Sequence, residues 1–163
     1  MERLWAPWRA QYVSSVAHAE SGCFLCEVLQ SDSSRDRELL VVARWDHCFA
    51  ILNRYPYNSG HVMVAPHRHV GDLEELSEAE LCVLMLRTRD VVQALRRAFS
   101  PHGFNIGLNI GRAAGAGLPE HIHVHIVPRW HGDTNFLPVT ADVKVVSHAL
   151  EDVYERLRAE LQQ

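Results

Sequence analysis

Residues 121–127 read HIHVHIV, a stretch in which three histidines alternate with isoleucine and valine. Side chains at alternate positions of a β-strand share one face, so His121, His123 and His125 are predicted to lie together while the aliphatic residues enter a core. Histidine is not among the residues enriched in strands, which argues against a merely solvated edge strand. The stretch therefore predicts a buried strand with a functional site on one face.

Two kinds of chemistry fit three neighbouring imidazoles. One is a catalytic zinc ion bound by all three, although side chains ~7 Å apart along a strand must splay to share one tetrahedral ion. The other is nucleophilic catalysis, in which a neutral imidazole attacks phosphorus and forms a phosphoramidate. The preceding loop, NIGRAAGAG at residues 109–117, has glycines that let backbone N–H groups approach phosphate oxygens. From the residues alone, both possibilities stay open.

The rest of the chain predicts an α+β domain with an antiparallel sheet. Apolar residues at helical spacing indicate a helix over residues 76–99, which opens with a capping box formed by Ser77 and Glu80. Short β-branched and aromatic runs predict a hairpin around Trp45 and Asp46 and two further strands before the histidines. The predicted ranges are 39–44 and 47–53 for the hairpin, 61–66 and 103–110 for the other strands, 31–38 for a polar loop and about 147–161 for a terminal amphipathic helix.

The chain length suits one domain, since the 163 residues contain no repeat or linker that would divide them. Residues 1–22 carry two tryptophans and little periodicity, so we expect an arm that packs onto something, such as another subunit. A net charge of −4 argues against nucleic acid or an anionic membrane as the partner. No apolar run approaches the ~20 residues of a membrane helix. The first residues lack the apolar core of a signal peptide, so we expect a cytoplasmic protein.

Two of the four cysteines, Cys23 and Cys26, form a C-x-x-C pair. In a reducing cytosol that spacing indicates half of a metal site or a redox pair before it indicates a structural disulfide. Cys48 and Cys82 have apolar neighbours, and we expect both to be buried as small hydrophobic residues.

The pattern N-x-G-x-x-A-G followed by H-φ-H-φ-H-φ-φ-P-R, over residues 109–129, resembles the signature of the histidine triad (HIT) superfamily of nucleotide hydrolases and transferases. The upstream stretch FAILNRYPYNSGHVMVAPHRHVGDL also resembles that family. RLWAPWR and RWHGDTNF resemble flanks of a bacterial branch that includes diadenosine tetraphosphate phosphorylases. The likeness covers nearly the whole chain. It implies a five-stranded antiparallel sheet with flanking helices that pairs as a homodimer and could extend to a tetramer.

Carried to matching positions, the resemblance implies different roles for the histidines. His123 is the expected nucleophile that becomes a nucleotidyl-histidine, His125 contacts the α-phosphate or bridging oxygen, and His61 supports both from behind. His121 and His69 are expected to complete a structural zinc site, a closed set of Cys23, Cys26, His69 and His121. The positions that match nucleotide-binding residues are Phe49, Ile51, Asn53, Asn109, Gly115, Ala116 and Gly117.

The resemblance implies an enzyme that acts on dinucleoside polyphosphates or another purine nucleotide, without an organic cofactor. Phosphorolysis of diadenosine tetraphosphate to ATP and ADP, with inorganic phosphate as acceptor, is the first hypothesis. The alternatives are a hydrolase of dinucleoside polyphosphates or nucleoside phosphoramidates, a nucleotide-binding regulator, and a metallohydrolase with zinc on the triad. Many relatives have a glutamine, serine or threonine at Gly117 that assists the leaving oxygen, so its absence here is more compatible with phosphorolysis. Trp130 could stack on an adenine or cover the core.

Overall fold

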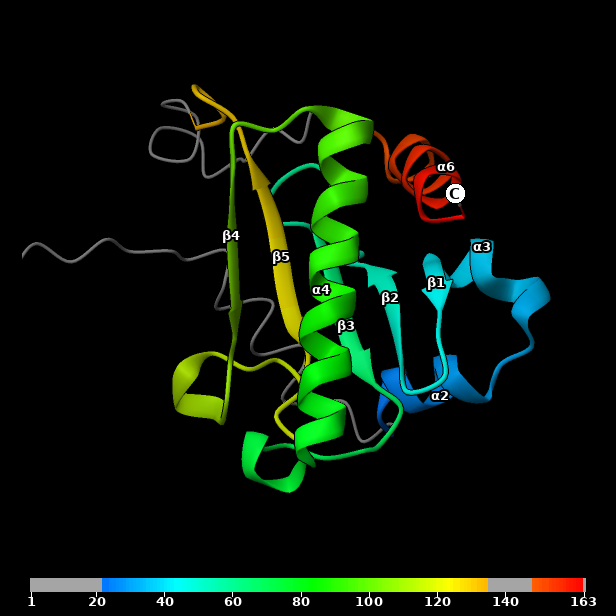
Figure 1. The fold of residues 1–163 in the computed structure, drawn as a ribbon, viewed down its shortest axis with the longest axis vertical. Helices are drawn as coiled ribbons and strands as arrows, with labels where there is room; N and C mark the ends of the chain where they lie inside the picture. The colour runs from blue at the N-terminus through cyan, green and yellow to red at the C-terminus, as the bar shows by residue number, and fades with distance from the viewer. Residues whose placement is uncertain (1–21, 135–147, 163) are drawn as a thin grey trace, which may run out of the picture.

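The computed structural model describes residues 22–134 and 148–162, which form a five-stranded antiparallel sheet with flanking helices (Figure 1). The strands lie in the order β1-β2-β3-β5-β4, with bounds β1 Val41–Arg44, β2 Cys48–Leu52, β3 Val62–Pro66, β4 Gly103–Leu108 and β5 Val124–Arg129. The helices are α2 Phe24–Gln30, α3 Asp36–Leu39, α4 Glu78–Phe99 and α6 Leu150–Leu161, with 3₁₀ turns η1 Ser33–Arg35, η2 Leu73–Glu75 and η3 Arg112–Ala114. Except for Gly22, the predicted arm over residues 1–22 lies outside the described residues. None of the helices in the described ranges combines the length and apolar character of a membrane-spanning segment.

Helices α4 and α6 pack on one side of the sheet and enclose the main core (Figure 1). Helix α4 begins where predicted because Ser77 and Glu80 form the capping box, and it ends at Ser100, whose φ of 47° is left-handed. The aliphatic residues between the histidines enter this core with at most 2% of their surface exposed; they are Ile122, Val124 and Ile126. The predicted division of HIHVHIV into a core side and a histidine side is confirmed.

The opposite face carries a smaller apolar cluster that includes residues of α2. Strand register aligns Ile51, Met63, His125 and Gly107 in one row across β2, β3, β5 and β4. Directly paired residues of antiparallel strands point to the same face. The row therefore places His125 beside the smaller cluster, on the face away from α4.

Strand β5 is regular only from Val124, so the prediction of one strand over residues 121–127 is wrong for its first three residues. The backbone N–H of Ile122 bonds to the carbonyl of Val70 at 2.7 Å instead of joining the strand ladder. The alternation of side chains still continues through this segment because Ile122 reaches the main core.

Several other boundaries differ from the prediction: β1 begins at Val41 rather than at residue 39, and β4 ends at Leu108 rather than at residue 110. The stretch 31–38 is not a simple loop but contains η1 and α3, because the Asp32 side chain caps the first turn. The terminal helix begins at Leu150, three residues later than predicted.

The two cysteines outside the C-x-x-C pair differ in burial. Cys48 on β2 is buried as predicted, whereas Cys82 on α4 is exposed, so that prediction is wrong. Cys82 lies two positions before the buried Leu84, which is about 200° of helical rotation, and therefore faces solvent.

Candidate active site and adjoining metal-ligand cluster

The imidazole of His123 is held in a single tautomer by the backbone. Its Nδ1 lies 2.8 Å from the carbonyl oxygen of His121, and a carbonyl can only accept, so Nδ1 carries the hydrogen. The side chain is 7% exposed, and burial lowers the pKa of His123 below its ordinary value. The ring is therefore neutral near pH 7, with the Nε2 lone pair available for attack.

His61 and His125 form a hydrogen-bonded pair next to His123. The backbone N–H of Tyr57 donates to His61 Nδ1 at 3.1 Å, so the hydrogen of the neutral ring must sit on Nε2. His61 Nε2 then donates to His125 Nδ1 at 3.0 Å, which leaves the His125 hydrogen on Nε2. Burial lowers the pKa of His61 to about 3, so this ring stays neutral and the order of donors is fixed.

Two N–H donors converge in front of these rings. Asn109 Nδ2 lies 3.5 Å from His125 Nε2, and in the tautomer set by His61 both nitrogens carry hydrogen. Two donors this close together have an acceptor in common, such as a phosphate oxygen, as their natural partner. The arrangement therefore favours an anion beside the unprotonated Nε2 of His123.

The glycine-rich loop makes a tight turn before the histidines. Gly111 and Gly115 have φ of 75° and 85°, which glycine adopts without strain. The N–H of Gly115 donates to Arg112 and that of Ala116 donates to Gly111 at 3.4 Å. Of Gly115, Ala116 and Gly117, the predicted nucleotide-binding residues of this loop, Gly117 is thus the one whose N–H has no hydrogen bond within the described ranges.

The other predicted nucleotide-binding residues lie at two ends of the site. Phe49 and Ile51 share the sheet face of His125 but are 0% and 4% exposed, packed in the smaller apolar cluster. The Asn53 side chain accepts the N–H of Tyr55 at 2.9 Å. At the far end, the indole Nε1 of Trp130 donates to the carbonyl of Phe99 at 3.4 Å, which supports a role in covering the core.

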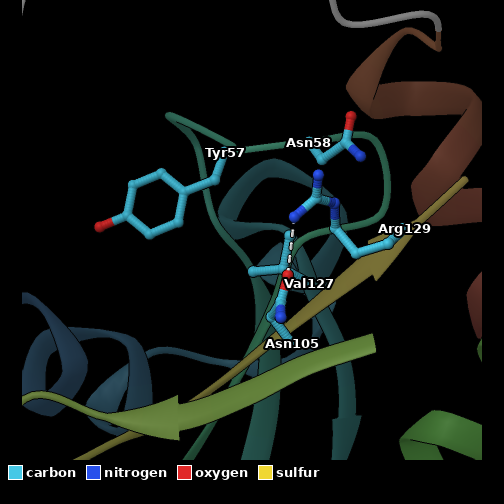
Figure 2. A pocket seen from close by; sticks show the side chains of 5 residues that line it. All are labelled: Tyr57, Asn58, Asn105, Val127 and Arg129. Atoms are coloured by element: carbon cyan, nitrogen blue, oxygen red, sulfur yellow. Dashed lines mark hydrogen bonds between the residues drawn. The ribbon is translucent and has the colours of Figure 1, made fainter. Parts of the chain in front are cut away.

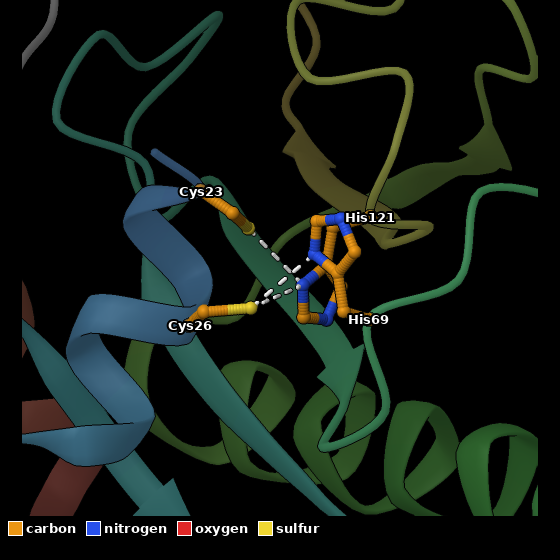
Figure 3. A group of neighbouring side chains, drawn as sticks. All are labelled: Cys23, Cys26, His69 and His121. Carbon is orange, nitrogen blue, oxygen red and sulfur yellow. Dashed lines mark hydrogen bonds between the residues drawn. The ribbon is translucent and has the colours of Figure 1, made fainter. Parts of the chain in front are cut away.

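The four predicted metal ligands come together at the start of the histidine segment. Cys23 and Cys26, at the beginning of α2, face the imidazoles of His69 and His121 (Figure 3). Their ligand atoms all lie within 4.8 Å of one another. His121 Nδ1 is 3.2 Å from Cys23 Sγ and 3.5 Å from Cys26 Sγ, and His69 Nδ1 is 3.3 Å from Cys26 Sγ.

The geometry of this cluster fits a tetrahedral ion. At typical zinc bond lengths, sulfur and nitrogen ligands of a tetrahedral site lie ~3.6 Å apart, close to the distances above. His121 Nε2 bonds to the carbonyl of Pro66 at 2.9 Å and so carries the hydrogen, which leaves Nδ1 free to bind metal. Burial raises the pKa of Cys23 to about 11, and a divalent cation would offset that cost by stabilising the thiolate. The cluster can therefore hold a metal ion.

The sequence did not reveal a network around Asp133. Its carboxylate accepts Arg129 Nε at 2.7 Å, Arg129 Nη2 at 2.8 Å, Asn58 Nδ2 at 2.8 Å and the N–H of Trp130 at 3.1 Å. A cavity of about 200 Å³ opens beside it (Figure 2), lined by Tyr57, Asn58, Asn105, Val127 and Arg129. These residues come from a turn and two strands, and no local pattern joins them.

Comparison with known proteins places these features in context. The HIT domain family model matches residues 35–132. The AP-4-A phosphorylase of Mycobacterium tuberculosis is 41% identical over 167 residues, covering 98% of this chain and 84% of that protein. The asymmetrical bis(5'-nucleosyl)-tetraphosphatase of Schizosaccharomyces pombe is 42% identical over 84 residues, covering 52% of this chain and 46% of that protein.

Solved structures share the fold over most of the chain. A Zn-bound histidine triad family protein from Mycobacterium smegmatis has a TM-score of 0.69 and 26% identity, covering 86% of this chain and 94% of that one. A hypothetical histidine triad nucleotide-binding protein from Sulfolobus tokodaii has a TM-score of 0.67 and 27% identity, covering 86% and 92%.

Proposed function

This chain is an enzyme of the HIT family, and from that premise we propose that it transfers a nucleotidyl group from a dinucleoside polyphosphate to inorganic phosphate. The observation that carries the proposal is the neutral imidazole of His123, whose Nδ1 is held by a backbone carbonyl and whose Nε2 is therefore the nucleophile. The 41% identity to a protein named AP-4-A phosphorylase supports phosphorolysis of diadenosine tetraphosphate.

The first step forms a covalent intermediate. His123 Nε2 attacks the α-phosphorus, a P–N bond forms, and the bond from that phosphorus to the bridging oxygen breaks. The Nε2–H of His125 stabilises the charge on the leaving oxygen, and the Asn109 amide holds a non-bridging oxygen. With diadenosine tetraphosphate, ATP departs and AMP stays on His123.

The second step releases the bound nucleotide. An oxygen of inorganic phosphate attacks the same phosphorus, the P–N bond breaks, and ADP leaves while Nε2 regains its lone pair. Water in place of phosphate gives AMP instead, and the likeness to the bis(5'-nucleosyl)-tetraphosphatase makes hydrolysis the second candidate. Gly117 has no side chain to assist a leaving oxygen, which accords with an acceptor that brings its own ionisable oxygen.

We assign the nucleoside to the sheet face beside His125. Phe49 and Ile51, which are buried in the smaller apolar cluster, would support the base pocket from within the sheet face, and Asn53 would meet the ribose. Asn109, Gly115, Ala116 and Gly117 would surround the α-phosphate, with Gly117 supplying the N–H that is free within the described part of the chain. Trp130 stays a second candidate for stacking on an adenine.

We assign zinc to the cluster of Cys23, Cys26, His69 and His121. A Cys₂His₂ donor set at these separations suits zinc, and a structural neighbour is described as Zn-bound. When bound, zinc would fix the position of His121. Because all four ligands come from the protein, the assignment is a structural ion.

We also propose a homodimer through β4 and α4. Strand β4 is at the edge of the sheet, where Ile106 is 48% exposed, and the neighbouring α4 exposes Met85 at 59%. An open edge strand with apolar side chains is a natural pairing surface. Light scattering after size exclusion tests the dimer, which Met85→Glu should weaken.

A product assay tests the reaction. Diadenosine tetraphosphate is incubated with and without inorganic phosphate, and the nucleotides are resolved by ion-exchange chromatography. Phosphorolysis gives ATP and ADP only when phosphate is present. AMP and ATP in equal amounts regardless of phosphate would instead establish hydrolysis, and His123→Ala is the control for contaminating activity.

A further inference from the structure

We propose that the cavity lined by Tyr57, Asn58, Asn105, Val127 and Arg129 is a second phosphate subsite, which holds a phosphate group beyond the α-phosphate. The proposal rests on the proposed function, because it concerns the same reaction. It explains residues that neither the triad nor the metal-ligand cluster uses (Figure 2).

The position of the cavity follows from the register of β5. His123, His125 and Val127 occupy alternate positions, so the cavity lies one step, ~7 Å, beyond His125 on the same face. The ring of Tyr57, which lines the cavity, has its centroid 5.9 Å from that of His125. In-line attack by His123 sends the leaving group to the opposite side of the α-phosphorus. Along this face the proposed nucleophile His123 comes first, then His125, which contacts the leaving oxygen, and then the cavity. This order matches the path of the polyphosphate chain.

The guanidinium of Arg129 is presented to this cavity in a fixed orientation. Its Nε and Nη2 bind the carboxylate of Asp133, and its Nη1 donates to Asn105 Oδ1 at 2.8 Å. The Asp133 side chain is 7% exposed while that of Arg129 is 42% exposed, so the carboxylate lies behind and the guanidinium faces the opening. A guanidinium held in this way loses little freedom when it binds a phosphate.

The remaining lining residues also favour an anion. Asn105 uses its oxygen to accept from Arg129, and its Nδ2 has no hydrogen bond within the described residues. No carboxylate is among the lining residues. A volume of about 200 Å³ is below the ~300–1,000 Å³ of sites that enclose whole small molecules. The cavity therefore suits a phosphate group better than a nucleoside.

Two sources could supply this phosphate, and they share one chemistry. In the first step it belongs to the departing polyphosphate, and in the second it is the attacking inorganic phosphate. Both occupy the side of the α-phosphorus opposite His123, because each displacement is in line.

Binding measurements test the subsite independently of turnover. We expect calorimetry to show tighter binding of ATP than of AMP, because only ATP carries phosphates that reach the cavity. Arg129→Gln should weaken ATP binding roughly 10-fold or more while AMP binding changes less than about twofold, and Asn105→Ala should give a smaller loss of the same kind. Arg35→Gln is the control for loss of one positive charge, because Arg35 is an exposed, ion-paired arginine outside the cavity lining and outside the proposed dimer surface.

Kinetics then separate the two sources. In Arg129→Gln, a raised KM for inorganic phosphate identifies the acceptor, and a raised KM for diadenosine tetraphosphate identifies the leaving chain. A rise in both KM values identifies one subsite that serves both steps. Equal affinity of the wild type for ATP and AMP, or equal losses for both in Arg129→Gln and Asn105→Ala, would overturn the subsite. A wild-type enzyme without turnover of dinucleoside polyphosphates would refute the proposed function yet leave the ATP and AMP comparison informative. If Arg129→Gln unfolds, Asn105→Ala on the exposed strand decides the question.

Discussion

His121 and His123 stand two residues apart, and both are buried and both are bound to a backbone carbonyl, yet they expose opposite nitrogens. His121 gives its Nε2–H to Pro66 and turns Nδ1 to the cysteines. His123 gives its Nδ1–H to the carbonyl of His121 and leaves Nε2 without hydrogen. The difference indicates that the motif supplies equivalent side chains, and that the carbonyl each ring meets decides which nitrogen is left without hydrogen, Nδ1 in the proposed metal ligand and Nε2 in the proposed nucleophile.

The largest effect should separate these two roles. His123→Ala removes the proposed nucleophile, and we expect turnover of diadenosine tetraphosphate to fall on the order of 10⁴-fold or more. The metal content measured by mass spectrometry should stay unchanged because the four ligands are intact. Retained turnover would contradict the assignment of His123.

Cys23→Ser should produce the converse pattern. We expect loss of bound zinc and a decrease of several kcal/mol in the free energy of unfolding, a part of the ~10–16 kcal/mol that zinc contributes in small zinc-dependent domains. Turnover should fall only about tenfold, because His123 is displaced through His121 but not removed. Metal analysis, urea unfolding and kinetics measure the three quantities.

Cys82→Ser is the matched control, since Cys82 is exposed and outside the cluster. It should leave metal content, stability and turnover unchanged. If Cys23→Ser retains its metal while His121→Ala loses both metal and activity, the ion belongs to the catalytic chemistry and the comparison between the two histidines breaks down.

Local patterns were sufficient for much of the fold and for the ligand set. The capping box of Ser77 and Glu80 and the hairpin around Trp45 depend on neighbours in the chain, and both are confirmed. The alternation of HIHVHIV correctly separated core from site. The resemblance to the family predicts the Cys₂His₂ set, and the structure places these four side chains together.

Features that depend on contacts between residues far apart in the chain could not be predicted from local sequence patterns. The start of β5 is set by the bond from Ile122 to Val70, which no periodicity encodes. The cavity requires Asn58, Asn105 and Arg129 to meet through the sheet register and through Asp133. The N–H of the glycine-rich loop that stays available for a ligand likewise depends on which hydrogen bonds form within that turn. The sequence therefore could not show that this N–H belongs to Gly117 rather than to Gly115.

Gly71 packs against the segment that leads into His121 and His123. Its substitution should therefore disturb both the metal-ligand cluster and the surroundings of His123 moderately. A Cβ at this position would lie 2.7 Å from the carbonyl oxygen of Pro119, in the segment just before His121. Gly71→Ala should lower the free energy of unfolding by about 1–3 kcal/mol, and metal affinity and turnover should fall together. Gly103→Ala, where a Cβ meets nothing within 4 Å, is the control. If stability falls while metal affinity and turnover stay normal, the contact of Gly71 with Pro119 does not control the positions of His121 and His123.

The smallest effect is a change in how steeply stability depends on pH. The pKa of His61 is about 3 in the folded state, below the ordinary value of 6.5, so the unfolded chain binds more protons between these values. Stability from this residue is complete above pH 6.5 and is lost as the pH falls toward 3, at up to ~1.4 kcal/mol per pH unit.

His61→Gln removes that titration while the side-chain oxygen can still accept the N–H of Tyr57. The variant should be less stable at pH 7 but should lose stability more slowly between pH 6 and pH 4, by about 1 kcal/mol per pH unit. Urea unfolding at each pH measures the slopes. Any contribution from His121 and the other residues of the proposed metal site is common to both proteins, so the difference in slope isolates the pair formed by His61 and His125. Parallel slopes would show that His61 is protonated in the folded protein, and the donor order that leaves hydrogen on His125 Nε2 would then no longer hold.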